Sequence, residues 1–296
     1  MEPLSHNIED YPEGIILPID KPYRWTSADV IRKVKYAAIR HFGKKNLKVG
    51  HAGTLDPLAT GILLVCIGPA TKRAEELQRS AKQYVAGVTF GATTPSYDLE
   101  KEIDATYPTD SVTREALLEV LPSFVGEQEQ IAPLFSAKSV DGVRAYELAR
   151  KMYREHLRTG ATFNHEQSEL LSKQNINIYG LELLEFIPAG CSPKGTVSTL
   201  GRVRGRGPLT ESVGGMERSG SSVGELTAGM TEKNNRSHVA DISEFDLPTA
   251  MVRVDCSKGT YIRALARDLG EALGSGAFLS SLRRTGNGGF TIEDAI

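Results

Sequence analysis

The order of apolar and polar residues along the chain predicts both strands and helices. Residues 62–67 form an unbroken apolar run of strand length, which is typical of a strand buried on both faces. Runs rich in β-branched and aromatic residues predict further strands at residues 14–22, 84–90, 176–179, 181–187 and 250–256.

Apolar residues at helical spacing predict helices between these strands. One such stripe covers residues 28–40 and follows Thr26 and Ser27, whose hydroxyl groups can cap the first turn. Similar patterns predict helices at about residues 71–81, 117–121, 145–152 and 260–273. Because no βαβ period repeats, we expect an α+β fold with a mixed, largely antiparallel sheet and flanking helices.

The composition fits a globular chain with a full hydrophobic core. Of the 296 residues, 40% are hydrophobic and 24% are charged, and no apolar stretch reaches the length of a membrane span. The N-terminus lacks the basic and apolar regions of a signal peptide, so we expect a cytoplasmic protein. Residues 189–240 are rich in glycine and serine and lack aromatic residues, which predicts a flexible insertion within a single domain over residues 1–296.

Charge and cysteine content restrict the partners. The formal net charge of −2 shows no overall basic excess, so a polyanion would have to bind a local patch. Each short basic cluster could be an ordinary solvated face, but the clusters flank the other notable segments, so they are interpreted as a phosphate-tracking surface. They are Lys44, Lys45 and Lys48, then Lys72 and Arg73, and finally Arg283 and Arg284. The three cysteines form no Cys-x-x-Cys pair, which indicates neither a disulfide framework nor a structural metal.

Asp56 is the first candidate for chemistry. It precedes Pro57 and lies between Gly53 and Gly61, just before the apolar run at residues 62–67. Proline disfavours the helical conformation in the residue before it, and glycine permits tight turns. We therefore expect Asp56 to be displayed on a rigid loop that a buried strand supports. An Asx turn that merely caps the loop is the alternative interpretation.

Tyr261 and Arg263 stand where the helix predicted at residues 260–273 begins. A helix N-terminus carries unsatisfied N–H groups and positive potential, so it favours a nearby anion. A guanidinium beside Asp56 would favour the ionised form of that carboxyl group. We therefore predict an ion pair between Arg263 and Asp56, with an ordinary surface arginine as the alternative.

Together these segments resemble the TruB family of pseudouridine synthases, which modify the T-loop uridine of transfer RNA. Order, spacing and consecutive identities agree over most of the chain. The matching segments are residues 14–22 with Thr26-Ser27, 48–72, Lys82-Gln83-Tyr84, 133–137, Asp141-Gly142, 146–150, 256–270 and Leu282-Arg283-Arg284. The resemblance implies a mixed-sheet catalytic domain with a central RNA-binding cleft, the T-arm of tRNA as partner, and no cofactor.

The resemblance also implies roles for particular residues. The implied catalytic residues are Asp56, Arg263 and Tyr84. The implied substrate-binding residues are His51, Tyr261, Leu282, Lys21 and Lys258. In this interpretation His51 packs in the space that the displaced nucleotide leaves, and Tyr84 stacks on the uracil. No metal site is implied.

The residue types suit the isomerisation of uridine. The reaction breaks the C1′–N1 bond, turns the base over, joins C5 to C1′ and removes the C5 proton. Asp56 could attack C1′ as a nucleophile or take the C2′ proton so that a glycal forms, and both routes stay open. The target base must first leave its stack, at a cost of about a few kcal/mol that aromatic stacking can offset.

Three alternatives share parts of this pattern. A guide-dependent branch that modifies ribosomal RNA has the same core motif and a C-terminal RNA-binding domain, which we expect this chain to lack. An RNA-binding protein without chemistry would not need Asp56, Tyr84 and Arg263 together. A glycoside hydrolase would need a second carboxylate, and none neighbours Asp56 in the sequence. We therefore expect isomerisation of uridine at position 55 of tRNA, without an obligate protein partner.

Overall fold

The computed structural model describes residues 4–136, 139–140, 143–160, 163, 173–190, 226–227, 230 and 237–296. The chain divides into two units, and each is built from separate stretches of sequence. Unit 1 comprises Met1–Arg79, Arg202–Arg236 and Gly286–Ile296, and unit 2 comprises Ser80–Gly201 and Ser237–Thr285. Most of the insertion expected at residues 189–240 lies outside the described residues, and the expectation of a single domain stays a prediction.

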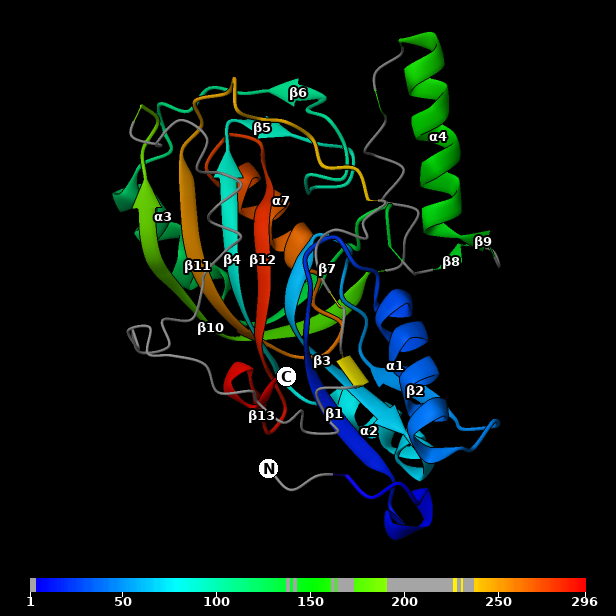
Figure 1. The fold of residues 1–296 in the computed structure, drawn as a ribbon. Helices are drawn as coiled ribbons and strands as arrows, with labels where there is room; N and C mark the ends of the chain where they lie inside the picture. Colours follow the sequence, from blue (N-terminus) through cyan, green and yellow to red (C-terminus); the bar gives the residue numbers. More distant parts are fainter. Residues whose placement is uncertain are drawn as a thin grey trace, which may run out of the picture. The chain divides into compact units, whose positions relative to one another are not determined.

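Unit 1 is organised around the apolar strand β3 (Ala59–Ile67), in which every residue is buried. Strands β1 (Ile15–Lys21) and β2 (Val49–Ala52) both pair with β3 in antiparallel register. Helix α1 (Ser27–Phe42) packs against β2 and β3 (Figure 1). The buried strand predicted at residues 62–67 is therefore confirmed, although it begins earlier, at Ala59.

Helix α1 confirms the predicted helix and its capping signal. Thr26 is the N-cap residue, and its hydroxyl accepts a hydrogen bond from the backbone N–H of Asp29. The Asp29 carboxylate accepts one in return from the backbone N–H of Thr26. This capping box satisfies two N–H groups that would otherwise lack partners in the helix. At the other end, Gly43 adopts the left-handed conformation with φ of 62°.

The remaining elements of unit 1 are short. They are η1 (Ile8–Asp10), η2 (Gly68–Arg73), α2 (Ala74–Arg79), β13 (Phe290–Thr291) and η5 (Ile292–Asp294). The helix predicted at residues 71–81 is thus a 3-10 turn followed by a short α-helix. Pro69 at the start of the turn presets this geometry. The last residue, Ile296, exchanges backbone hydrogen bonds with Pro18 and Asp20 of β1.

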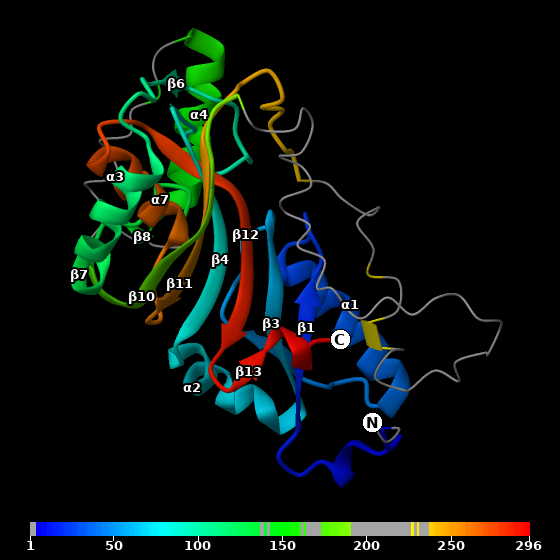
Figure 2. The ribbon, with the colours of Figure 1, turned by 90° about the vertical axis from the view of Figure 1, so that its left-hand side faces the viewer.

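Unit 2 contains an antiparallel sheet with the strand order β12, β4, β11, β10, β7 (Figures 1 and 2). Its strands are β4 (Lys82–Phe90), β7 (Gly126–Gln130), β10 (Gln174–Ile187), β11 (Thr249–Cys256) and β12 (Ala277–Asn287), of which β12 ends in unit 1. The two strands predicted at residues 176–179 and 181–187 are one strand whose register with β11 shifts twice. Strand β12 was not predicted.

Helices cover one face of this sheet. Figure 2 shows α3 (Arg114–Val120) and α7 (Ile262–Ala272) on the same side of β10 and β11. The other elements of unit 2 are η3 (Leu121–Phe124), α4 (Ala145–Thr159), β5 (Ala92–Thr93), β6 (Ala105–Thr106), β8 (Ser139–Val140) and β9 (Val143–Arg144). A parallel bridge between Asp98 and Leu279 accompanies the antiparallel pairs. The predicted α+β fold with a mixed, largely antiparallel sheet is therefore confirmed.

No helix in the described part of the chain combines the length and the apolar character needed to cross a bilayer.

A substitution at Gly14, directly before β1, would test how closely the backbone packs in unit 1. Its φ is +76°, and a Cβ atom there would lie 2.3 Å from the backbone nitrogen of Ala70. We expect Gly14→Ala to lower the free energy of unfolding by about 3 kcal/mol, because backbone strain and the clash add. Gly43→Ala is the matched control, since its φ is +62° and nothing lies within 4 Å. Urea denaturation should show about 1 kcal/mol for Gly43→Ala, and equal losses would contradict the clash.

Candidate active site

Asp56 lies half-buried in the loop at residues 53–58, between β2 and β3. Gly53 and Gly61 flank it with φ of 94° and 97°, a region that side chains disfavour. The backbone N–H of Ala59 donates to the Asp56 carbonyl at 3.1 Å and closes a turn. The predicted position of Asp56, on a loop directly before a buried strand, is therefore confirmed.

Ser27 holds the residue directly before Asp56. Its hydroxyl donates to the carbonyl of Leu55 at 3.1 Å and accepts from the N–H of Leu55 at 2.9 Å. The Ser27 residue is only 3% exposed, so both bonds are shielded from water. The sequence indicated Ser27 only as a capping candidate, whereas the cap is Thr26. No local signal reveals the contact between Ser27 and Leu55, because 28 positions separate them.

Lys21 holds the residue directly after Asp56. Its Nζ atom donates to the carbonyls of Pro57 at 3.1 Å, Trp25 at 2.6 Å and Pro22 at 3.1 Å. An ammonium group has three N–H donors, so it can donate to all three of these carbonyls. Lys21 is also fully buried, and its predicted contact with substrate stays a prediction. Together Lys21 and Ser27 fix both neighbours of Asp56.

A hydrogen-bonded row shows which face of the unit 2 sheet carries Tyr84. Gln83 donates to Asp255 at 2.9 Å and accepts from Thr285 at 2.9 Å, so these side chains share one face. Successive side chains alternate between the faces of a strand. Tyr84 on β4 and Leu282 on β12 therefore lie together on the opposite face, as the predicted uracil pocket requires. Contact between either residue and a base stays a prediction.

The face of the sheet that carries Tyr84 and Leu282 also carries two buried cations. Lys82 is 7% exposed and Arg284 only 1%. Burial, with a further contribution from the charge of Arg284, lowers the pKa of Lys82 to about 8. Burial raises the pKa of Cys256, which pairs with Lys82 across the strands, to about 11. The prediction that Arg284 belongs to a phosphate-tracking surface is therefore wrong, because β12 places this side chain inside the protein.

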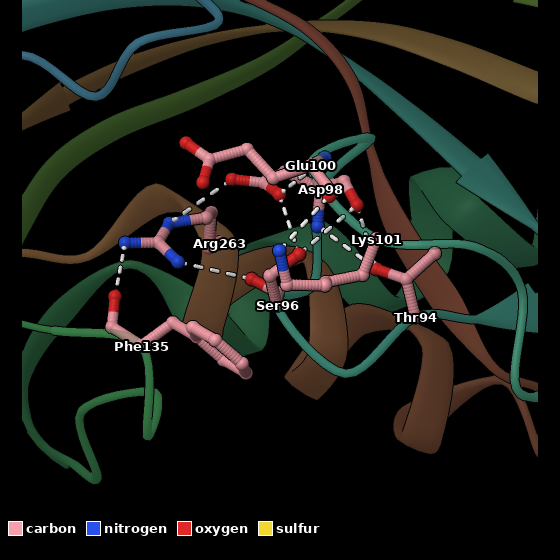
Figure 3. A network of polar contacts seen from close by, with 7 residues as sticks. All are labelled: Thr94, Ser96, Asp98, Glu100, Lys101, Phe135 and Arg263. Atoms are coloured by element: carbon pink, nitrogen blue, oxygen red, sulfur yellow. Dashed lines mark hydrogen bonds and ion pairs between the residues drawn. The ribbon is translucent and has the colours of Figure 1, made fainter. Parts of the chain in front are cut away.

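Arg263 is bound by a network within unit 2 (Figure 3). Its Nη1 donates to the carbonyl of Ser96 at 3.0 Å, and its Nη2 donates to the carbonyl of Phe135 at 2.9 Å. Its Nε lies 3.7 Å from Oδ2 of Asp98. With 6% exposure, Arg263 is not the surface arginine of the alternative interpretation. Its predicted pairing with Asp56 stays a prediction, since the two residues belong to different units.

Asp98 is itself held in place. Its Oδ1 accepts from the Ser96 hydroxyl at 2.6 Å and from the Glu100 N–H at 2.9 Å (Figure 3). The Thr94 hydroxyl donates to its carbonyl at 2.7 Å. A carboxylate with several donors is well suited to orient a neighbouring guanidinium. Sequence reasoning missed Asp98, although its position after a Thr-Thr-Pro-Ser turn was an available signal.

Tyr261 is fixed through its backbone. Its N–H donates to Oε1 of the buried Gln130 at 2.9 Å, and Nε2 of Gln130 donates to the Tyr261 carbonyl at 3.2 Å. The ring packs against a cluster that includes Leu134 and Phe163. Tyr261 is the N-cap of α7, so the predicted helix start is shifted by about two residues. Gln130 was not predicted, because it is 131 positions away in the sequence.

The two other predicted substrate contacts are accessible to different degrees. His51 lies half-buried on β2, opposite Val65 of β3. Lys258 is exposed in a turn whose next residue, Gly259, has φ of +87°. Contact of His51 or Lys258 with substrate stays a prediction.

Comparison with known proteins identifies the class. A family profile described as TruB family pseudouridylate synthase (N terminal domain) matches residues 40–189. "tRNA pseudouridine synthase B" of Phocaeicola vulgatus is 44% identical over 97% of this chain and 91% of its own length. The protein of the same name from Flavobacterium johnsoniae is 38% identical over 97% and 94%. The protein is a pseudouridine synthase, an enzyme that isomerises uridine in RNA. The chain belongs to the TruB family.

Solved structures agree with this assignment at the level of the fold. The structure titled "Crystal Structure of a Cbf5-Nop10-Gar1 Complex" contains a chain that matches with a TM-score of 0.51 and 22% identity. The match covers 96% of this chain and 52% of that one, so this chain spans about half the length of its structural relative.

Removal of the Ser27 hydroxyl should loosen the Asp56 loop. We expect Ser27→Ala to cost about 1–3 kcal/mol of stability, because the buried N–H and carbonyl of Leu55 would be left without their partner. We also expect a fall in kcat of about tenfold or more, since the carboxylate is no longer held in position. Ser275→Ala is the matched control, because buried Ser275 donates to Pro108, outside this loop. Thermal melts and pseudouridine formation measure both effects, and a similar fall in kcat for the control would contradict the clamp.

Arg263→Lys should disable the enzyme while preserving the charge. A lysine ammonium cannot reach Ser96, Phe135 and Asp98 with the planar fork of a guanidinium. We expect kcat to fall by about 10²-fold or more, as when one oriented electrostatic group is removed. Arg253→Lys is the control, since this partly exposed side chain pairs with Glu182 on the sheet. Full activity of Arg263→Lys in single-turnover assays would show that the fork is dispensable.

Proposed function

We propose that this chain converts uridine to pseudouridine at position 55 in the T-loop of transfer RNA, with Asp56 as the catalytic carboxylate. The relatives that match nearly the whole chain at 38–44% identity carry the name tRNA pseudouridine synthase B. The observation that carries the assignment of Asp56 is the pair of clamps: Ser27 binds Leu55, and Lys21 binds Pro57. A loop whose only task was to turn the chain would not need a buried ammonium and a buried hydroxyl beside one carboxylate.

The proposed reaction needs four contributions from the protein. Asp56 acts at the ribose, either on C1′ as a nucleophile or on the C2′ proton as a base, and an ionised carboxylate serves both routes. Arg263 stabilises that charge. Tyr84 stacks on the uracil after the base has left the loop, and His51 fills the vacated space. The C5 proton is then removed once C5 has joined C1′.

A guide-dependent activity on ribosomal RNA has less support. The Cbf5 complex resembles this chain in fold at 22% identity, whereas the relatives named as tRNA enzymes are about twice as similar in sequence. An assay without guide RNA separates the two activities directly.

Tritium release from uracil C5 tests the proposal. Purified protein is incubated with unmodified tRNA transcript that carries tritium at uracil C5, without guide RNA or added metal. We expect tritium release from this transcript and none from one whose position 55 is cytidine. Asp56→Asn should abolish release, because the amide is neither a nucleophile nor a base of comparable strength.

The controls make the assay decisive. Asp241→Asn changes an exposed carboxylate that accepts a local bond from Ser243, and it should keep full activity. Free uracil instead of pseudouridine would indicate a hydrolase. Undiminished release by Asp56→Asn, or release that does not depend on position 55, would overturn the proposal.

A further inference from the structure

One stretch of this chain carries cations and no carboxylates, and it holds seven of the 35 lysine and arginine residues. Between Asp29 and Asp56 the sequence contains no carboxylate and seven lysine or arginine residues. They are Arg32, Lys33, Lys35, Arg40, Lys44, Lys45 and Lys48. The whole chain has a formal net charge of −2, so the rest of the protein is acidic by comparison. The stretch creates a local positive potential that the average composition hides.

Helix α1 presents these charges on the face that points away from its own core. The helix buries Val30 and Val34 against the sheet of unit 1. Its exposed side carries Lys35 and Arg40, and between them Tyr36 is 69% exposed. Beyond the helix, Lys44, Lys45 and Lys48 are exposed in the segment before β2. A helix of this length extends for about 24 Å, enough to follow several phosphates of a polynucleotide.

Most of these charges have no acidic partner among the described residues. Arg32 pairs with Asp29 at 3.1 Å, and Lys44 pairs with Glu9 at 2.7 Å. Within the described part of the chain, no ion pair involves the five others: Lys33, Lys35, Arg40, Lys45 and Lys48. Three exposed or partly exposed cations elsewhere are ion-paired with carboxylates, namely Arg79, Lys173 and Arg253.

We propose that the α1 basic surface, defined as Lys33, Lys35, Tyr36, Arg40, Lys45 and Lys48, binds the sugar–phosphate backbone of a paired stem in the substrate RNA. The inference rests on the proposed function, because that function supplies an RNA whose modified loop closes a stem. Phosphates attract an unpaired row of cations and release counterions when they bind. An exposed tyrosine can contact the ribose hydroxyl groups that a stem displays. With Tyr36 as its only exposed aromatic ring, the surface lacks the apolar face of a membrane-binding helix.

Hydrogen bonds and strand pairing connect the α1 basic surface to the loop that carries Asp56. Ser27 in the first turn of α1 hydrogen-bonds Leu55, the residue before Asp56. Lys48 directly precedes β2, whose pairing with β3 fixes the other end of the same loop. A stem bound along α1 would therefore be held in a constant position relative to the carboxylate, within unit 1 alone. This binding would direct the loop of the RNA without contacting the reacting nucleotide.

Two triple variants of equal charge test the proposal. The first changes Lys35, Arg40 and Lys45 to glutamine. The control changes three ion-paired cations to glutamine: Arg79, Lys173 and Arg253. Both remove three positive charges, so they alter the overall charge equally. Each is made in the Asp56→Asn chain, and fluorescence anisotropy measures its Kd for a T-arm RNA stem-loop between about 50 and 200 mM salt.

We expect the α1 variant to raise Kd about tenfold or more. The slope of log Kd against log salt should fall by about 0.7–0.9 for each phosphate that the variant no longer neutralises. The control should change neither quantity. For an unpaired RNA of the same length, the α1 variant should weaken binding less than it does for the stem-loop. With Asp56 present, the α1 variant should show a raised KM and an unchanged kcat.

Three outcomes would overturn the inference. Equal effects of both variants would indicate overall charge and not this surface. Unchanged affinity would show that the surface does not bind the stem. Equal weakening on paired and unpaired RNA would exclude the stem. The proposed function fails separately: an active-site-intact chain that binds the stem-loop through α1 but releases no tritium would overturn that function alone.

Discussion

The structure depends on the way one loop is held. Ser27 binds both backbone groups of Leu55, and Lys21 donates to the carbonyl of Pro57, so the peptide groups on either side of Asp56 are tied to β1 and α1. Buried hydrogen bonds of this kind are costly to break, because the groups would be left without water or partner. These hydrogen bonds therefore hold the backbone of the loop in place even when the surroundings of the Asp56 carboxylate change. Such rigidity suits the proposed role of Asp56, in which the carboxylate must meet a ribose at one fixed position.

Unit 2 uses the same principle for a cation. The guanidinium of Arg263 donates to the carbonyls of Ser96 and Phe135, and Asp98 lies on its third side. Asp98 is oriented in turn by Ser96 and Glu100. A buried charge with several hydrogen bonds keeps a single orientation, and removal of one partner would leave the other charge uncompensated. Buried polar contacts thus hold the backbone beside Asp56 in unit 1 and the guanidinium of Arg263 in unit 2.

The sequence predicted the features that depend on neighbouring residues and missed those that depend on residues far apart in the chain. The Asp56 loop, the strand after it and the capped helix α1 depend on neighbouring residues, and all three were predicted. The contacts of Ser27 with Leu55 and of Gln130 with Tyr261 join positions 28 and 131 apart, and no local pattern encodes them. Strand β12 was missed because serine and arginine interrupt its apolar residues. That omission also placed Arg284 on the surface, although the strand buries it.

The charge of one segment also differs from the net charge of the whole chain. A net charge of −2 excludes a uniformly basic protein, but it does not describe residues 30–55, where cations occur without carboxylates. If acidic residues were interspersed there, they would pair with the cations at helical spacing and remove the attraction for phosphate. Carboxylates are absent over 26 consecutive positions directly before Asp56. Folding alone does not require this absence, whereas the binding of phosphates would favour it.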